Sequence, residues 1–337
     1  AGAAAAGEIV DMALDSREDD LVLCTFTGGA SALTPALHPE IPLADVQRLT
    51  CMLLKCGATI HEINTLRKHL SRFSGGSLVR AAFPATVLGL IVSDVVGDDL
   101  DVIASGPTVP DPSTFADCLR VVEHYGLRWK MPQSIWTHIE RGLQGRTPET
   151  PKADEPAFGR VRNVLVASVK QALEAAADEA ARCGFVPRIL TTAMSGEARR
   201  TAAQLVAEAR RAQAGLRPGD APLCLLAGGE TTVTIRGNGK GGRNQEMALA
   251  ATLELADDRG IDLICVGTDG TDGPTDAAGG YAFSGDLARL RAIGLHPKES
   301  LDANDSYPLL LKAGTLLRTG PTRTNVMDMS IMLVRPK

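Results

Sequence analysis

No Cys-x-x-Cys pair occurs in the sequence, and no apolar run approaches the roughly 20 residues that a membrane-spanning helix needs. The seven cysteines lie in apolar runs or helix-like segments, which indicates reduced, buried thiols and argues against a disulfide framework or a zinc site. A surplus of basic residues is missing too, because the net charge is −5. We therefore expect a cytoplasmic protein that binds neither membranes nor nucleic acid.

Three signatures of known enzyme classes are also missing. No strand is followed by a G-x-G-x-x-G loop with an acid about 20 positions later, and residues 237–242 match that loop only approximately. The sequence contains no Walker A motif and no G-x-S-x-G elbow. These absences argue against a nicotinamide site, a P-loop and a serine hydrolase.

The hydrophobic pattern that is present predicts an α/β fold. Apolar β-branched runs alternate with amphipathic stretches, as expected for βαβ units around a parallel sheet. Residues 216–222 contain two prolines and a glycine between a long predicted helix and the next strand, which indicates a domain boundary. We expect two domains, residues 1–215 and 222–337. Strands are predicted at 21–26, 86–92, 163–167, 188–192, 223–227, 231–235, 262–266 and 330–334, and helices at 43–56, 113–124, 170–183, 197–214 and 244–255.

The most informative segment is a glycine loop that carries two cations and leads into a predicted helix. Backbone N–H groups at a helix start, together with fixed cations, suit a phosphate or carboxylate group. The glycines would let a ligand approach the backbone, although such cations are more often solvated and an asparagine here can simply cap the helix. The anion-binding candidates are Gly239, Lys240, Gly241, Gly242, Arg243 and Asn244.

Acidic residues follow neighbouring predicted strands. Asp269, Asp272 and Asp276 stand in the turn after the strand at 262–266, and Glu230 follows the strand at 223–227. Turn chemistry alone can account for Asp-Gly pairs. Three carboxylates in one turn also suit Mg²⁺, a hard cation that shares its oxygen ligands with nucleotide phosphates. A glycine loop beside an acidic turn therefore predicts phosphoryl transfer.

The first domain contributes a second group of candidates. One glycine pair follows the first strand, one acidic segment follows the second strand, and a polar cluster occupies about one helical turn. Each has an ordinary structural explanation as a turn or as a solvated helix face. The candidates are Gly28, Gly29 and Ser31 for an anion, Asp94 for acid–base chemistry or metal binding, and Asn64, Arg67, Lys68 and Ser105 for a small carboxylate substrate.

Together these segments resemble the glycerate 2-kinase family of the MOFRL type, whose members have also been labelled hydroxypyruvate reductases. The resemblance runs through residues 27–31, 62–71, 93–112, 228–246 and 267–280. It implies ATP- and Mg²⁺-dependent phosphorylation of the 2-hydroxyl of D-glycerate. It also implies a cleft between a larger Rossmann-like domain and a smaller C-terminal α/β domain. Residues 1–20 do not match the glycine-rich, lysine-bearing segment with which family members usually begin, so we expect that segment to be lacking.

The expected roles follow from this resemblance and from the chemistry of the side chains. Lys240 and Arg243 would hold the ATP phosphates, and Asp269 and Asp272 would carry Mg²⁺. Either Glu230 or Asp94 would accept the substrate proton, and the sequence does not choose between them. Two alternatives remain, an NAD(P)H-dependent hydroxypyruvate reductase and a non-catalytic nucleotide or sugar-acid sensor. A homodimer is the prior expectation for such an enzyme.

Overall fold

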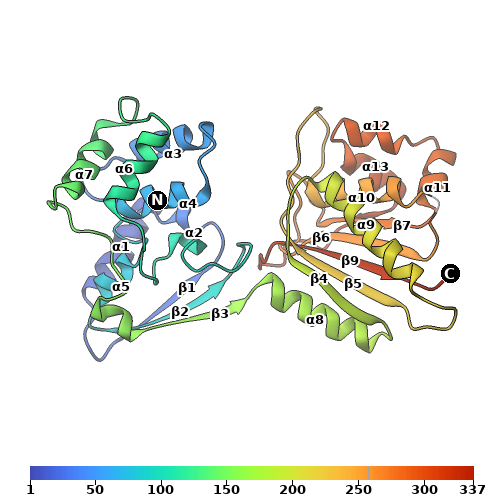
Figure 1. Cartoon of the computed structure of the whole chain (residues 1–337), viewed down its shortest axis with the longest axis horizontal. Helices are drawn as coiled ribbons and strands as arrows, with labels where there is room; N and C mark the ends of the chain where they lie inside the picture. The colour runs from blue at the N-terminus through green and yellow to red at the C-terminus, as the bar shows by residue number, and fades with distance from the viewer. Residues whose placement is uncertain (257) are drawn as a thin grey trace. The chain divides into compact units, whose positions relative to one another are not determined.

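A computed structural model describes residues 1–256 and 258–337, and the chain forms two compact α/β units (Figure 1). The first unit contains residues 1–92 and 98–166. The second contains residues 93–97 and 167–337 and therefore takes the longer part of the chain.

The first unit combines a small sheet with a helical core. Its strands β1 (Leu21–Phe26), β2 (Thr86–Val92) and β3 (Val161–Ala167) lie in the order β1-β2-β3, and β1 runs parallel to β2. The main core lies among four helices, because apolar residues at helical spacing, such as Leu53, Leu66 and Ile139, face one another. The helices are α1 (Gly2–Leu14), α2 (Ala30–Leu33), α3 (Leu43–Lys55), α4 (Ile60–His69), α5 (Ser77–Ala82), α6 (Phe115–His124) and α7 (Gln133–Leu143), with short 3₁₀ turns at Ile103–Ser105 and Pro156–Arg160.

The second unit is built on a six-stranded mixed sheet in the order β4-β5-β9-β6-β7-β8. Only β4 and β5 are parallel, and the other neighbours pair antiparallel. The strands are β4 (Val186–Met194), β5 (Leu223–Gly229), β6 (Ile261–Gly267), β7 (Gly279–Phe283), β8 (Leu316–Leu317) and β9 (Asp328–Val334). The helices are α8 (Val169–Arg182), α9 (Ala198–Ala214), α10 (Arg243–Glu254), α11 (Asp286–Ala292), α12 (Pro297–Asp302) and α13 (Ser306–Ala313).

Strand β5 explains how helices cover both faces of this sheet. Successive side chains of a strand point to opposite faces. Cys224 and Leu226 pack with α8, whereas Leu223, Leu225 and Ala227 belong to the core formed with α9 and α10. Every residue of β5 is buried as a result. This burial on both faces matches the nearly continuous apolar run from which the strand was predicted.

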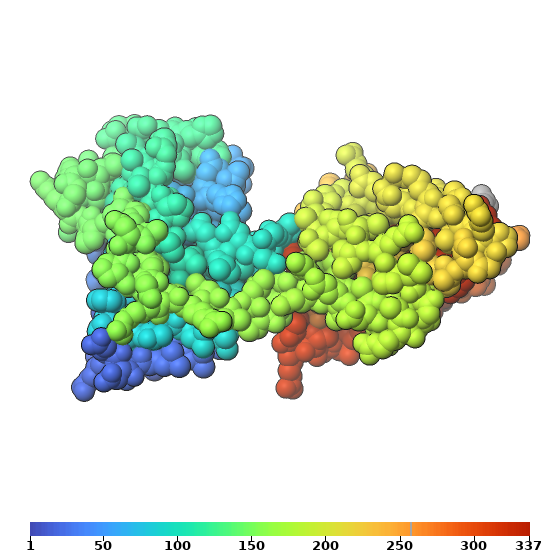
Figure 2. All heavy atoms as spheres, turned by 60° about the horizontal axis from the view of Figure 1, so that its bottom comes forward, coloured from blue at the N-terminus to red at the C-terminus, as the bar shows by residue number. Residues whose placement is uncertain are grey.

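The compact units divide between Val166 and Ala167, so the boundary expected at 216–222 lies inside the second unit. The reason is strand pairing, because β4 pairs with β5 along its length and α9 packs against α10. Figure 2 shows α8 and α9, coloured yellow-green to yellow, forming part of the surface of the second unit. Strand pairing and core packing therefore place β4 and α9 with the sheet of the second unit.

One predicted strand is absent from the structure. Residues 231–235 form only a single bridge, between Glu197 and Thr232. Their polar groups are bound elsewhere, because the Thr232 N–H donates to the Gly196 carbonyl at 2.8 Å and the Thr234 N–H donates to the Glu197 carboxylate at 3.2 Å. The segment thus becomes one wall of a pocket.

Within the described residues, none of the helices combines the length and the apolar character needed to cross a bilayer. All seven cysteines are free thiols. Cys118, Cys224 and Cys265 are buried as expected, but Cys51, Cys56 and Cys183 are exposed. The exposed three lie on or next to the outer faces of α3 and α8, where the helical pattern alone did not separate inside from outside.

Candidate functional site

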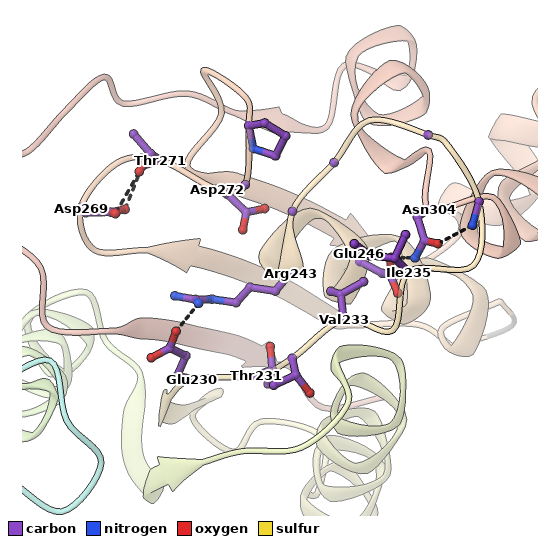
Figure 3. Close-up of a pocket in the computed structure, with 17 residues that line it drawn as sticks. Glu230, Thr231, Val233, Ile235, Arg243, Glu246, Asp269, Thr271, Asp272 and Asn304 are labelled. Atoms are coloured by element: carbon purple, nitrogen blue, oxygen red, sulfur yellow. Dashed lines mark hydrogen bonds and ion pairs between the residues drawn. The ribbon is translucent and has the colours of Figure 1, made fainter. Parts of the chain in front are cut away.

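A pocket of about 650 Å³ opens in the second unit at the carboxyl end of β5 (Figure 3). The segment after β5, the start of α10 and the turn after β6 form its walls, and Asn304 closes one end. The lining residues are Glu230, Thr231, Thr232, Val233, Ile235, Gly237, Gly239, Gly241, Gly242, Arg243, Glu246, Asp269, Thr271, Asp272, Gly273, Pro274 and Asn304. Strand ends of this kind are where open α/β sheets place their ligands.

Arg243, the first residue of α10, is fixed by a buried carboxylate. Its Nε and Nη2 atoms donate to the two oxygens of Asp328 at 2.6 and 3.1 Å, and Nη1 pairs with Glu230. Burial raises the pKa of Asp328 to about 6, although the guanidinium opposes that rise. Burial would lower the pKa of Arg243, but Asp328 and Glu230 raise it, so the guanidinium stays charged. The bidentate pair with Asp328 fixes the guanidinium, and its remaining nitrogen, Nη1, faces Glu230 at the wall of the pocket.

Asp272 has a different role from the predicted metal ligand. Its Oδ1 accepts from the Asn244 N–H at 3.1 Å and the Asn244 amide at 3.4 Å. Its Oδ2 accepts from the Gln245 N–H at 2.8 Å and the Gln245 amide at 2.9 Å. A carboxylate has about four lone-pair positions, so these four donors occupy all of them. Asp272 therefore caps α10 from a distant turn, and the N–H groups of Asn244 and Gln245 are paired with it.

Asp269 is better placed for a cation. It lines the pocket and accepts from the Thr271 N–H and hydroxyl, both at 2.9 Å, which leaves lone pairs on both of its oxygens. Among the described residues no group of three or more His, Cys, Asp or Glu stands close enough to hold a metal ion. Mg²⁺ is commonly held by one or two carboxylates with substrate phosphates, and Asp269 has lone pairs available for such an ion, whereas those of Asp272 accept hydrogen bonds. The third acid of the turn, Asp276, accepts from the Tyr307 hydroxyl at 2.7 Å.

The glycine loop packs against the protein, which changes the reason for its glycines. A Cβ at Gly239 would meet Asp305 at 2.5 Å, one at Gly241 would meet the Ser306 hydroxyl, and one at Gly242 would meet Asp272. These glycines are therefore required by close packing within the chain, and the sequence had suggested ligand access instead. The loop still forms a wall of the pocket, so a ligand there would meet backbone.

Lys240 and Asn244, two of the predicted anion-binding residues, do not line the pocket. The Lys240 ammonium stands 4.3 Å from the centre of the Tyr307 ring, and Lys240 does not line the pocket. Asn244 is not the helix cap, because α10 starts one residue earlier with Gly242 at the cap position. The Asn244 side chain is buried, and its Oδ1 has no hydrogen-bond partner among the described residues.

Asp94 is grouped with the second unit, within residues 93–97. It is half-buried, and burial raises the pKa of its carboxyl with a further contribution from the charge of Glu230. Glu230 itself is exposed and paired with Arg243. The two predicted proton acceptors are therefore close enough to interact electrostatically.

In the first unit, the structure brings Ser31, Asn64 and Ser105 together although they are far apart in sequence. The Ser31 and Ser105 hydroxyls are 2.8 Å apart, and the Ser105 hydroxyl donates to the Asn64 side-chain oxygen at 3.3 Å. Ala104 and Ser105 both adopt positive φ, at 53° and 59°, which is unfavourable for residues with a Cβ. Such strain marks a backbone that its surroundings hold in place. Gly28 and Gly29 precede α2, and Gly29 uses a positive φ of 82° at its start.

The two cations of α4 differ sharply. Lys68 is buried and pairs with Asp101 and, at 3.6 Å, with Asp111. Arg67 is half-buried, burial lowers the pKa of its guanidinium, and its side chain has no hydrogen-bond or ion-pair partner among the described residues. Arg67 is therefore the free cation of this cluster, whereas Lys68 already has two acids.

Asp328 and Asn304 are among the residues of the pocket region that were not predicted. Asp328 lies 85 positions from the arginine it holds, and Asn304 lies in a turn between α12 and α13. A carboxylate at the start of an otherwise apolar strand, residues 328–334, was the available signal for Asp328. The sequence contains no such signal for Asn304, because asparagine is common in turns.

Comparison with known proteins identifies the family. A domain of unknown function (DUF4147) matches residues 1–140 and the MOFRL family matches residues 223–328. A glycerate 2-kinase from Pyrococcus horikoshii is 46% identical over 96% of this chain and 72% of its own length. A D-glycerate 2-kinase from Thermotoga maritima is 43% identical over 97% of this chain and 75% of its own length. A crystal structure of glycerate kinase from Thermotoga maritima superposes with a TM-score of 0.91 at 42% identity, over 99% of this chain and 78% of that chain. The resemblance seen in the sequence is confirmed, and the chain belongs to the glycerate 2-kinase family of phosphotransferases.

Proposed function

We propose that the chain transfers the terminal phosphate of ATP, in the presence of Mg²⁺, to the 2-hydroxyl of D-glycerate and so forms 2-phosphoglycerate. The names of its relatives support the acceptor. The observation that carries the proposal is Arg243, a charged guanidinium fixed by buried Asp328 in the wall of a pocket lined by glycines and Asp269. Phosphoryl transfer depends mainly on positioning and on charge neutralisation, which these residues supply.

Each residue has a role that follows from its surroundings. Arg243 would bind phosphate oxygens through Nη1, and the phosphate would displace the exposed Glu230 carboxylate from that atom. Bound Mg²⁺ would neutralise charge on the phosphate oxygens, and Asp269 is the residue that would hold it. Glu230 and Asp94 remain the two proposed acceptors of the substrate proton.

Residues of the first unit are proposed to recognise the acceptor. Arg67 is the cation without a partner among the described residues, so it would bind the glycerate carboxylate. Ser105 and Asn64 would orient the hydroxyl groups, and the Gly28–Gly29–Ser31 turn would support Ser105. Lys68, held by Asp101 and Asp111, would keep α4 in place and make no direct contact with the substrate.

A direct assay tests the proposal. Purified protein is given ATP, Mg²⁺ and D-glycerate, and the products are identified by NMR, with NADH and hydroxypyruvate supplied in a parallel reaction. We expect ADP and 2-phosphoglycerate to form in equal amounts and NADH to remain. Consumption of NADH without ATP would establish the reductase instead, and binding of nucleotide without turnover would establish a sensor.

The variant Arg243→Ala tests the central residue. Loss of a guanidinium that stabilises phosphoryl transfer should lower turnover by about 10³-fold. The variant also leaves Asp328 buried without its cation, so its stability should fall as well. The double variant Arg243→Ala with Asp328→Asn removes that buried charge and should regain stability but not activity. Arg210→Ala, which removes a surface pair with Asp258, is the matched control, and wild-type turnover in Arg243→Ala would exclude the proposed role.

A further inference from the structure

The glycine loop is held by a segment far away in the sequence. The Gly239 N–H donates to the Ala303 carbonyl at 3.0 Å, and the Lys240 N–H donates to the Asp305 carboxylate at 2.9 Å. In return, the Tyr307 N–H donates to the Lys240 carbonyl at 2.9 Å. The segment between α12 and α13 therefore forms the support on which this wall of the pocket rests.

Asn304 is the centre of that support. Its side-chain oxygen accepts from the Arg236 N–H at 2.6 Å and from the Gly237 N–H at 3.1 Å. Its amide nitrogen donates to the Thr234 carbonyl at 3.3 Å and to Glu246 at 2.9 Å. An asparagine side chain has two donor and about two acceptor positions, so every one is used. Such complete pairing fixes the position of the loop backbone better than a single contact.

The same side chain connects the loop to the body of the unit. Glu246 is buried in α10 and also accepts from the Arg199 Nε of α9 at 2.6 Å. Figure 3 shows Asn304 and Glu246 side by side at the end of the pocket near Val233 and Ile235. The Asn304 backbone itself has a φ of 54°, a left-handed conformation that asparagine tolerates better than most residues. Residue type and geometry therefore agree at this position.

We propose that Asn304 is the positioning residue of the glycine loop, because it holds the backbone of residues 234–237, which leads into that loop. This inference rests on the proposed function, because it assigns the loop to the phosphate donor. Asn304 acts through the backbone of residues 234–237: its amide sets the distance between that backbone and the opposite wall at Asp269–Pro274. Its loss leaves the catalytic groups in place but widens the binding site for the nucleotide.

Kinetics of Asn304→Gly and Asn304→Ala test the assignment. Glycine accepts the left-handed backbone, so Asn304→Gly removes only the side-chain hydrogen bonds, whereas Asn304→Ala adds backbone strain. We expect both variants to raise the KM for ATP about tenfold, or roughly 1.4 kcal/mol, with kcat and the KM for D-glycerate near their wild-type values. Titration calorimetry with an ATP analogue should show the same loss of affinity.

Gln213→Ala is the matched control. Gln213 is a buried amide of α9 that donates to the Arg259 and Arg335 carbonyls at 2.7 and 2.9 Å, away from the pocket. Its removal should lower the melting temperature but leave the KM for ATP unchanged. A wild-type KM for ATP in Asn304→Gly would overturn the assignment, as would an equal rise in Gln213→Ala. If the wild-type protein phosphorylates no glycerate but binds the analogue, the proposed function fails, and calorimetry alone still tests Asn304.

Discussion

The contact between Arg243 and Asp328 is the clearest case in which one residue sets the state of another. Asp328 is fully buried at the start of β9, in a place where a charge is unfavourable without a partner. The guanidinium compensates through two hydrogen bonds, yet burial still keeps the pKa of Asp328 at about 6. Holding Arg243 in place with a buried carboxylate therefore lowers the stability of the folded protein near neutral pH.

The variant Asp328→Asn should reveal this cost through its pH dependence. The pKa of Asp328 in the folded protein is about 6, above its ordinary value of 3.8. A raised pKa means that the contribution of the group to stability is fully present below the ordinary value and is lost as the pH rises through about 6. Asparagine does not titrate. The free energy of unfolding of Asp328→Asn, relative to the wild type, should therefore rise between about pH 4 and about pH 7.

Urea denaturation at the two pH values measures this difference. Asp94, whose pKa is also raised by burial, is present in both proteins and cancels in the comparison, whereas the charge of Asp272 contributes to the raised pKa of Asp328 and belongs to the measured difference. An equal difference at both pH values would show that Asp328 is not the group responsible. Turnover should fall in Asp328→Asn at every pH, because a neutral amide orients Arg243 less firmly.

At the scale of elements, the start of α10 shows how a helix end can be misread from sequence. The sequence predicted N–H groups free to bind an anion, and the structure gives them to Asp272. Two donors of the predicted anion site are thus paired with a carboxylate of the chain itself. Asp269 and Asp272 both line the pocket, but Asp272 caps α10, whereas Asp269 keeps lone pairs that accept no hydrogen bond.

The variants Asp272→Asn and Asp269→Asn should separate these two roles. Asp272→Asn turns an amide group toward N–H donors, so α10 should lose about 1 kcal/mol of stabilisation, as other helix caps do. Asp269→Asn should change the free energy of unfolding by no more than about 0.5 kcal/mol but raise the Mg²⁺ concentration needed for half-maximal activity. Urea denaturation without metal and a Mg²⁺ titration of turnover provide the two measurements. A wild-type stability of Asp272→Asn combined with a shifted Mg²⁺ requirement would restore Asp272 as a metal ligand.

The same elements show how far sequence patterns reach. Strands such as β5 and β6 were predicted because their apolar runs reflect burial, and α9 was predicted because its alanines and Gly215 mark a helix and its end. Arg243 and Asp269 were predicted as site residues for a similar local reason, since glycines and acids at strand ends are visible in a short window. Asp328 and Asn304 were missed because their partners are distant in sequence, and tertiary partners leave no local pattern. The strand predicted at 231–235 does not form for the same reason, because the Thr234 N–H donates to Glu197 and the Thr234 carbonyl accepts from Asn304.

At the scale of the whole molecule, the position of the division decides which fragments should fold. The MOFRL match begins at residue 223, close to the boundary expected from the prolines. The sheet begins earlier, because β4 is the parallel neighbour of β5. Helix α9 packs on one face of this sheet and contributes Leu205, Val206 and three alanines to the core shared with α10.

A fragment of residues 167–337 is therefore expected to fold, and one of residues 222–337 is not. The shorter fragment loses α8, β4 and α9, which exposes both faces of β5 and leaves one edge unpaired. Each large apolar side chain that loses its burial costs roughly 1.5–3 kcal/mol, and several such losses exceed the stability of an ordinary domain. Circular dichroism with urea denaturation should show one cooperative transition for the longer fragment and none for the shorter. A cooperative transition of similar midpoint in the 222–337 fragment would mean that the C-terminal segment is an independent domain. In that case β4 and α9 would be additions to a core that stands without them.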